Sequence, residues 1–265
     1  MKLNKSILAA LMLASGAAVT GFAQAAVAAN IDTTAACALL PTHDQLQSAL
    51  TWARMQSNGG FNLDMWGTVV NRDGIVCAVA FTGANRGSQW PGSRVISAQK
   101  ANTANAFSLP QLALSTADLF SAVNPGGSLY GLQASNPVDT FVAYGGNPAD
   151  YGQVNDPMVG GRIGGVNVFG GGLALYNKQG VLIGALGVSG DSSCADHNIA
   201  WRTRNQLKLD YVPGGVGPDT TRPDNIVYDI TPATGLQIGV SASGWGHPVC
   251  SAAAVTISLG LPVVR

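Results

Sequence analysis

The sequence predicts a mixed α+β fold in which helices pack on an antiparallel sheet. Two pairs of apolar runs are each joined by a short turn sequence, and helical patterns precede and follow each pair. A Gly- and Pro-rich stretch, residues 124–165, separates the two pairs. Runs joined by tight turns form antiparallel hairpins, and helices set between hairpins rather than between single strands indicate α+β organisation.

The first 25 residues have the pattern of a cleavable signal peptide. Lys2 and Lys5 precede an uncharged stretch over residues 6–22, and residues 23–25 (Ala-Gln-Ala) are the small residues that a signal peptidase requires. We therefore predict export to the periplasm or the medium. The mature chain of about 240 residues is long enough for one sizeable domain, and we expect it to lack a membrane span.

The charge balance excludes two classes of partner. Only 11% of the residues are charged, and the formal net charge is zero. Loss of the two signal-peptide lysines lowers that charge to −2. A protein with so little charge lacks the basic surface that binds nucleic acid or anionic lipid.

The first half of the chain predicts a helix, a hairpin and further helices. Leu46 and Leu50 give the first helix an apolar face, and Thr42 or Asp44 is suited to cap it. Asp73-Gly74 between two apolar runs is a strong hairpin signal. The predicted elements are, in order, a helix over 42–56, strands over 66–70 and 75–81, a helix over 93–107 and a weaker helix over 111–122.

The second half predicts one more hairpin and one more helix. Gly and Pro are too dense in residues 124–165 to sustain regular elements. The predicted elements that follow are strands over 172–176 and 181–188, a helix over 194–207, and a tail, residues 208–265, with β-like runs over 225–230, 237–240 and 254–259.

Four cysteines in an exported chain indicate two disulfides, for which three pairings are possible. We predict Cys194–Cys250, which connects the tail to the last helix of the main domain. We predict Cys37–Cys77 as the second, because Cys37 precedes the first helix and Cys77 lies in a core strand that this helix is expected to cover.

An alternative uses the same cysteines as metal ligands. His197 follows Cys194 by three residues, and His247 precedes Cys250 by three. Two imidazoles and two thiolates are a possible tetrahedral site for zinc or copper. A disulfide sulfur is a poor metal ligand, so the metal site and the Cys194–Cys250 disulfide nearly exclude each other.

Several motifs resemble the GlcG/HbpS-type haem-binding family, which is related to the C-terminal domain of PduO-type proteins. They lie in the family's order over residues 42–207. These motifs are Asn71–Ala80, Ala98-Gln-Lys-Ala-Asn-Thr-Ala104, Phe169–Tyr176, Gln179–Gly190, and Asp196 with Ile199-Ala200. The chain departs from the pattern at Leu173, where the family has proline, in its longer 124–165 stretch, and in a tail without counterpart.

The resemblance implies a profilin-like fold with an antiparallel sheet of about five strands flanked by helices. On that basis residues 26–207 form the GlcG/HbpS-like domain, and residues 208–265 form an extension packed on it. The resemblance further implies a homo-oligomer and non-covalently bound haem, and it is compatible with a partner sensor or transport protein.

Four residues are the haem contacts that the resemblance indicates. Thr103 matches the family threonine proposed as a haem ligand, and His43 is the nearest candidate for a family histidine in the first helix. Arg94 and Lys100 share a predicted helix with Thr103 and are suited to pair with haem propionates. If the tail supplies the iron ligand instead, His247 is that ligand.

Three functions follow from these patterns. The first is haem capture, storage or sensing, because an iron held by a weak hydroxyl ligand suits reversible carriage better than catalysis. The second is a small-molecule enzyme with a metal at Cys194, His197, His247 and Cys250. The third is a structural oligomer without a ligand.

Overall fold

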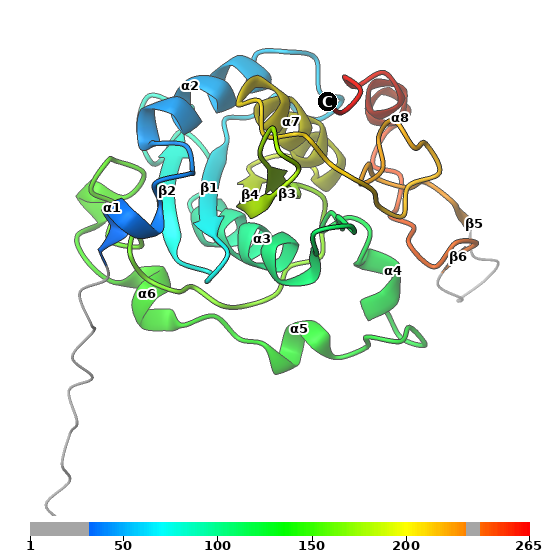
Figure 1. Ribbon diagram of the computed structural model, residues 1–265, viewed down its shortest axis with the longest axis horizontal. Coiled ribbons are helices and arrows are strands. Elements are labelled where there is room, and N and C mark those ends of the chain that lie inside the picture. The colour runs from blue at the N-terminus through cyan, green and yellow to red at the C-terminus, as the bar shows by residue number, and fades with distance from the viewer. Residues whose placement is uncertain (1–31, 232–238) are drawn as a thin grey trace, which may run out of the picture. The chain divides into compact units, whose positions relative to one another are not determined.

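The computed structural model describes residues 32–231 and 239–265. The predicted signal peptide, residues 1–25, lies outside these described residues. Helices lie on both faces of a central antiparallel sheet (Figure 1). The α+β class predicted from the sequence is therefore confirmed.

Two hairpins form the sheet. The first joins β1 (Trp66–Asn71) to β2 (Val76–Phe81), and the second joins β3 (Gly172–Tyr176) to β4 (Leu182–Ser189). Because β1 also pairs with β4, the order is β2-β1-β4-β3, and all neighbours are antiparallel. The sheet has four strands where about five were expected.

The turn of the first hairpin depends on the side chain of Asn71. Its Oδ1 accepts hydrogen bonds from the backbone N–H groups of Asp73 and Ile75, each at 2.9 Å. Gly74 completes the turn with φ of +75°, a left-handed conformation that glycine adopts without a steric cost. The Asn-Arg-Asp-Gly sequence thus determines both the position of the turn and the register of β1 against β2.

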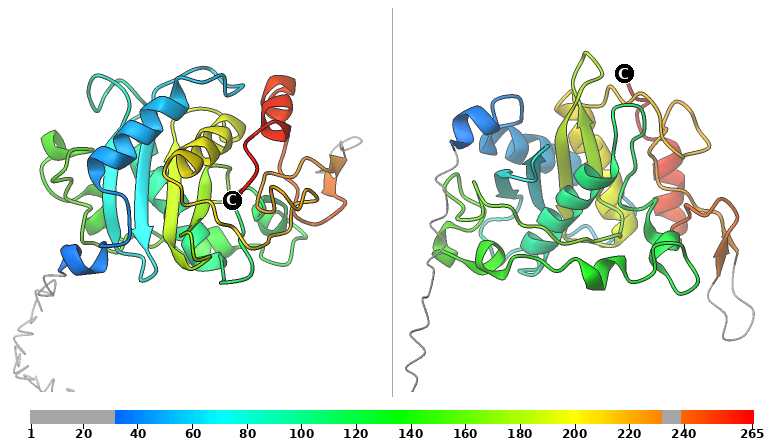
Figure 2. Two further views of the ribbon diagram at one scale, coloured as in Figure 1. Left: turned by 45° about the horizontal axis from the view of Figure 1, so that its top comes forward. Right: turned by 60° about the horizontal axis from the view of Figure 1, so that its bottom comes forward.

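Three long helices cover the sheet. α3 (Ser93–Phe107) packs on one face, while α2 (His43–Arg54) and α7 (Ser193–Gln206) pack on the other and against each other (Figure 2). α3 approaches β4 so closely at Gly187 that a Cβ there would collide with the backbone of Ser97. The glycine-rich pattern of β4 therefore serves the contact between helix and sheet.

The helix predicted over residues 111–122 is wrong for most of its length. Only α4 (Phe120–Val123) is helical, because Ala113 instead donates its N–H to Gly214 of the tail at 2.8 Å. Pairing with a distant segment thus overrides a weak local helix preference. The described residues also contain the short helical segments α1 (Thr33–Ala36), α5 (Leu132–Ser135), α6 (Thr140–Tyr144) and η1 (Pro148–Asp150).

The tail contains a two-stranded ribbon of β5 (Ile230–Thr231) and β6 (Val240–Ser241), followed by α8 (Ala252–Leu259). The β-like run predicted over 254–259 is wrong, since this segment is helical. The Ser251 side chain caps it by accepting from the N–H of Ala254 at 3.0 Å. In the predicted runs over 225–230 and 237–240, only the last residues, Ile230 and Val240, belong to strands. Residues 237–238 lie outside the described part.

Two disulfides connect distant segments. Cys37 pairs with Cys77, next to α1 and on β2, and Cys194 pairs with Cys250, between α7 and the tail. These are the pairings predicted from the sequence, and they are compatible with an oxidising compartment. None of the helices in residues 32–231 and 239–265 has the length and apolar character needed to cross a membrane.

Candidate functional site

Arg94, a predicted propionate contact, is buried in an ion pair. Its Nε donates to Asp156 Oδ2 at 2.9 Å, Nη2 pairs with Asp156 Oδ1, and Nη1 donates to the carbonyl of Ala143 at 2.8 Å. Its guanidinium carbon lies 3.7 Å from the centroid of the Tyr151 ring. Arg94 therefore holds the segment that contains Tyr151 and Asp156 against the beginning of α3.

Lys100 is also buried and paired. Its Nζ donates to Asp196 Oδ2 at 2.7 Å and to the carbonyl of Val188 at 3.1 Å. Burial raises the pKa of Asp196 to about 6, while the charge of Lys100 opposes this shift. The pair links α3 to α7 across the end of β4, so the ammonium group is occupied within the fold.

The Thr103 hydroxyl makes two hydrogen bonds within the fold. It donates to the carbonyl of Gln99 at 2.8 Å and accepts from the N–H of Asn167 at 2.9 Å, and the residue is fully buried. Binding of this hydroxyl to iron requires that its hydrogen bond from the N–H of Asn167 open. Thr103 as a haem contact stays a prediction.

His43 lies at the start of α2 and is partly buried. Its Nδ1 lies 2.8 Å from Asp44 Oδ1 and its Nε2 lies 2.9 Å from the carbonyl oxygen of Gly152. The backbone N–H of Gly152 in turn bonds Asp156, the partner of Arg94. Of the four predicted haem contacts, the structure thus brings His43 and Arg94 to one segment, residues 151–156, and places Lys100 and Thr103 further along α3.

An apolar cavity of about 400 Å³ opens beside this segment. We call it the aromatic cavity, because Trp66, Tyr144 and Tyr151 form much of its wall. The other lining residues are Arg86, Gly87, Pro91, Gly92, Arg94, Val95 and Pro148. Its volume and apolar character are those of a small-molecule site. Asp156 neutralises Arg94, so Arg86 is the lining cation that favours an anionic ligand.

Arg86 is a candidate that the sequence reasoning missed. It is exposed and makes no hydrogen bond or ion pair with any residue that the structure describes. Its position in the loop between β2 and α3 puts this cation at the cavity. The available signal was an arginine close to Trp90 in a Gly-, Ser- and Asn-rich stretch, a composition typical of binding loops.

The Cys/His cluster forms a second candidate site. The two sulfurs of Cys194 and Cys250 and one ring nitrogen of His247 lie within 4.8 Å of one another. His247 is buried, its Nδ1 lies 2.8 Å from the carbonyl oxygen of Pro248, and its Nε2 has no partner among the described residues. In the disulfide state the sulfurs are bonded to each other and do not act as metal ligands.

His197 does not join this group. Its Nε2 lies 3.1 Å from Asn225 Oδ1, which also accepts the N–H of Ile226 at 3.0 Å. Burial lowers the pKa of His197 to about 3, so the ring is neutral. Of the four ligands of the alternative metal site, the structure therefore brings three together and directs His197 to the tail.

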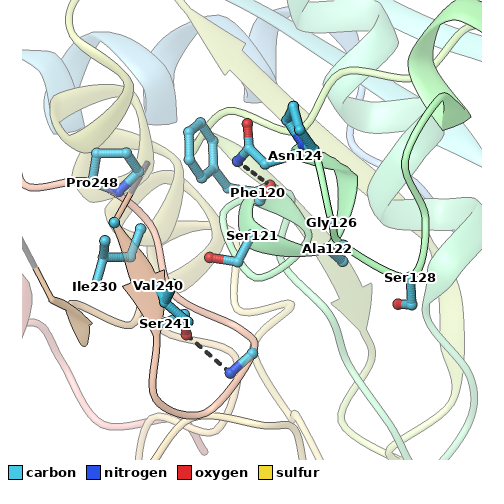
Figure 3. Close-up of a pocket in the computed structure, with 14 residues that line it drawn as sticks. Phe120, Ser121, Ala122, Asn124, Gly126, Ser128, Ile230, Val240, Ser241 and Pro248 are labelled. Carbon is cyan, nitrogen blue, oxygen red and sulfur yellow. Dashed lines mark hydrogen bonds between the residues drawn. The ribbon is translucent and has the colours of Figure 1, made fainter. Parts of the chain in front are cut away.

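A pocket of about 630 Å³ lies between α4 and the β5–β6 ribbon (Figure 3). Phe120, Ile230, Val240 and Pro248 are its main apolar side chains, and no titratable side chain of the described residues lines it. The Phe120 ring lies 5.1 Å from the ring of His247, centroid to centroid, so the histidine is behind the wall. This ribbon pocket lacks the charge that would orient a polar ligand.

The antiparallel sheet and the three covering helices define an α+β fold class. The chain belongs to the HbpS-like family, whose model, described as haem degrading protein HbpS-like, matches residues 42–204. Membership confirms the resemblance seen in the sequence and supports a haem-related function.

Several solved structures are similar to this chain. A PduOC–haem complex is 25% identical, with 64% of this chain and 96% of that chain covered and a TM-score of 0.44. The protein ORFY of Klebsiella pneumoniae is 24% identical, with 62% and 86% covered and a TM-score of 0.42. A double mutant of HbpS from Streptomyces reticuli is 17% identical, with 76% and 99% covered and a TM-score of 0.37. No curated protein matches the chain.

Proposed function

We propose that this chain is an exported protein that binds haem non-covalently in the aromatic cavity, for capture, storage or sensing. The observation that carries the proposal is a cavity with aromatic walls and an unpaired cation, Arg86, in a member of the HbpS-like family. Haem is a flat apolar molecule with two carboxylates. Its burial against aromatic side chains is favourable, and cations at the rim hold the carboxylates.

Two aromatic side chains of the cavity, Tyr151 and Trp66, make contacts within the fold. Arg94 stacks on Tyr151, whose hydroxyl lies 3.0 Å from the carbonyl oxygen of Tyr144. Trp66 is fixed by a hydrogen bond from its Nε1 to the carbonyl of Trp90 at 3.1 Å. Tyr151 and Trp66 are therefore held by contacts within the fold, which lowers the entropy lost on binding.

His43 is the proposed iron donor. It does not line the aromatic cavity but bonds Gly152, the neighbour of the lining residue Tyr151, so it meets haem in the cavity only if the 151–156 segment moves. Both of its ring nitrogens face oxygen acceptors, so ligation requires Nε2 to release the carbonyl of Gly152. When bound, haem would supply an iron centre that coordinates a further ligand or changes its oxidation state. Lys100 and Thr103 remain predicted contacts, and their hydrogen bonds within the fold have to open for haem to reach them.

We also propose a homo-oligomer. Phe141, on α6 in the long stretch between the hairpins, exposes 89% of its surface, and Tyr130 and Val154 in the same stretch are also exposed. Exposed apolar side chains of this size are typical of surfaces that bind a partner. Sedimentation velocity of the wild type and of Phe141→Ser tests this. We expect an oligomer for the wild type and a smaller species for the variant, and a monomeric wild type would contradict the proposal.

A haemin titration followed by the Soret band tests the haem proposal. We expect saturable binding at micromolar concentration and about tenfold weaker binding for Arg86→Ala, the loss of one charge-assisted hydrogen bond. Lys178→Ala, which removes an exposed lysine in the β3–β4 turn, is the matched control and leaves binding unchanged.

The iron donor is tested in the same titration. His43→Ala is expected to shift the Soret band and weaken binding, while His197→Ala and His247→Ala leave the band in place. A shift with His247→Ala instead would place haem next to the tail. A wild-type protein that gives no saturable Soret change contradicts the haem proposal as a whole.

Haem degradation is a second candidate, favoured by the description of the family. The test is the stability of the Soret band of the haemin-loaded protein under air with ascorbate. Loss of the band at a rate above that of free haemin supports degradation, whereas a stable band supports carriage.

A further inference from the structure

The Cys194–Cys250 disulfide lies at the first turn of α7. Cys194 is the second residue of this helix, and its backbone N–H donates to the sulfur of Cys250 at 3.2 Å. The N–H of Cys250 donates to the sulfur of Cys194 at the same distance, 3.2 Å. Each sulfur therefore already accepts a backbone hydrogen bond, and both lie where the positive end of the helix dipole favours thiolates.

A buried histidine lies beside this disulfide, with one of its ring nitrogens within 4.8 Å of both sulfurs. His247 is 2% exposed, and its Nε2 has no hydrogen-bond partner in residues 32–231 and 239–265. Because Nδ1 lies against the carbonyl oxygen of Pro248 at 2.8 Å, Nδ1 carries the proton and Nε2 has the free electron pair.

We propose that reduction of Cys194–Cys250 creates a metal site in which both sulfurs and His247 bind a thiophilic ion, Zn²⁺ or Cu⁺. The sulfurs and one ring nitrogen lie within 4.8 Å of one another before any rearrangement. Ligands around tetrahedral zinc, with Zn–S of about 2.3 Å and Zn–N of about 2.0 Å, are roughly 3.5–3.8 Å apart. Only a modest separation of the two sulfurs is needed.

The unequal exposure of the two cysteines sets the order of reduction. Cys250 is exposed and Cys194 is buried. A thiolate of a dithiol reductant attacks the Cys250 sulfur, the S–S bond breaks, and its electron pair leaves on the Cys194 sulfur. The second thiolate of the dithiol then displaces the Cys250 sulfur. The dithiol becomes a disulfide, both cysteines are reduced, and metal binding releases any protons they carry to solvent.

The other disulfide of the chain is an internal control. Cys37 and Cys77 connect α1 to β2, and they belong to no cluster of potential metal ligands in the described part of the chain. Reduction of both disulfides is therefore expected to generate one metal site, not two.

The test is a Zn²⁺ titration of the purified protein in competition with a chromophoric chelator. The protein is reduced with dithiothreitol, desalted under argon and compared with its oxidised form. We expect one Zn²⁺ per chain after reduction and none before. The Cys37→Ser/Cys77→Ser variant is expected to bind one Zn²⁺ after reduction. The Cys194→Ser/Cys250→Ser variant is expected to bind no Zn²⁺.

The role of His247 is tested by His247→Gln. Mutation of a residue that only hydrogen-bonds to a metal ligand lowers metal affinity by about 10–100-fold. Loss of His247, a direct ligand, is therefore expected to weaken Zn²⁺ binding at least about tenfold. Co²⁺ absorption of the reduced wild type is the second readout: thiolate charge-transfer bands with tetrahedral ligand-field bands support the site, even if the variant fails to fold. Reduced wild type that binds no Zn²⁺, or a folded His247→Gln with unchanged affinity, overturns the proposal. Neither outcome depends on haem.

Discussion

The two sides of the sheet differ in how completely their buried polar groups are bonded. The helix α3 carries the family motif at residues 98–104. Its side chains Arg94, Lys100 and Thr103 all have hydrogen-bond partners within the fold. Where the tail meets α7, His197 Nδ1, Arg204 Nε and His247 Nε2 are buried without a partner among the described residues. No atom of α3 in the described part is in that state.

This difference separates two kinds of polar residue. An unbonded polar group inside a protein costs free energy, so a bonded group is sufficiently explained by stability, whereas an unbonded one requires another reason. The residues that a family motif marks on α3 are explained by packing. Packing does not explain the unbonded Nε2 of His247. We therefore place a metal site where the tail meets α7, rather than on α3.

The largest effect is expected from breaking the α3 side. Arg94→Leu leaves the buried carboxylate of Asp156 without its cation, and we expect a loss of about 3–5 kcal/mol of unfolding free energy, measured by urea denaturation. Lys178→Leu, at an exposed lysine in the β3–β4 turn, is the control and changes stability by less than about 0.5 kcal/mol. A small loss for Arg94→Leu would mean that this arginine is held for a ligand and not for the fold.

The two disulfides provide the next comparison. Replacing either pair with serines is expected to cost about 2–4 kcal/mol, through the chain entropy of the unfolded state. Their rates of reduction are expected to differ, because Cys250 is exposed while Cys37 and Cys77 are partly buried. Alkylation and mass spectrometry during mild dithiothreitol treatment measure the order. Opening of Cys37–Cys77 first would contradict the accessibility argument.

The tail side is also expected to be sensitive to acid. The folded-state pKa values of His197 and His247 are about 3 and 4, below the ordinary value of 6.5, because both rings are buried. The unfolded chain therefore takes up protons first, so stability is full above about pH 6.5 and falls as the pH drops toward 4. Each histidine contributes a loss of about 2 kcal/mol at pH 5.

The variant His197→Gln isolates this effect. Asp196, with a folded-state pKa raised to about 6, acts in the opposite direction, since its stabilising protonation is lost as the pH rises from about 4 to 6. That contribution is common to wild type and variant. We therefore expect a shallower fall in stability between pH 7 and pH 5 for His197→Gln, by urea denaturation at each pH. Parallel curves would mean that His197 is not buried in its neutral form.

Much of the fold was predictable because its signals are local. Asn71-Arg-Asp-Gly74 specifies a turn, and α3 begins and ends at the predicted residues, Ser93 and Phe107. Thr42, one of two predicted caps, is the residue that caps α2, by accepting from the N–H of Gln45. Each of these signals works within a few residues of the chain, so no knowledge of the tertiary fold is needed.

The other elements depend on distant partners. The segment around Ala113 is extended because Gly214 accepts its N–H, and the Asp156 partner of Arg94 is 62 residues away. From the sequence alone, Arg94 and Lys100 were cations on the same predicted helix as Thr103, suited to pair with propionates. Their buried partners, Asp156 and Asp196, become apparent only when the loop and α7 are folded onto α3.

The smallest effect is the most informative about the family motif. Thr103→Val keeps the shape of the side chain and removes a hydroxyl that bonds Gln99 and Asn167. Since the N–H of Asn167 is then left unpaired, we expect a loss of about 1 kcal/mol in urea denaturation. If haem occupies the aromatic cavity, the Soret position and the haemin affinity stay those of the wild type. Thr103→Ser restores the hydroxyl and is the control for stability. A shifted Soret band in Thr103→Val, with the wild-type band in Thr103→Ser, would instead show that the hydrogen bond from Asn167 opens and that the threonine binds the iron, as the family resemblance predicts.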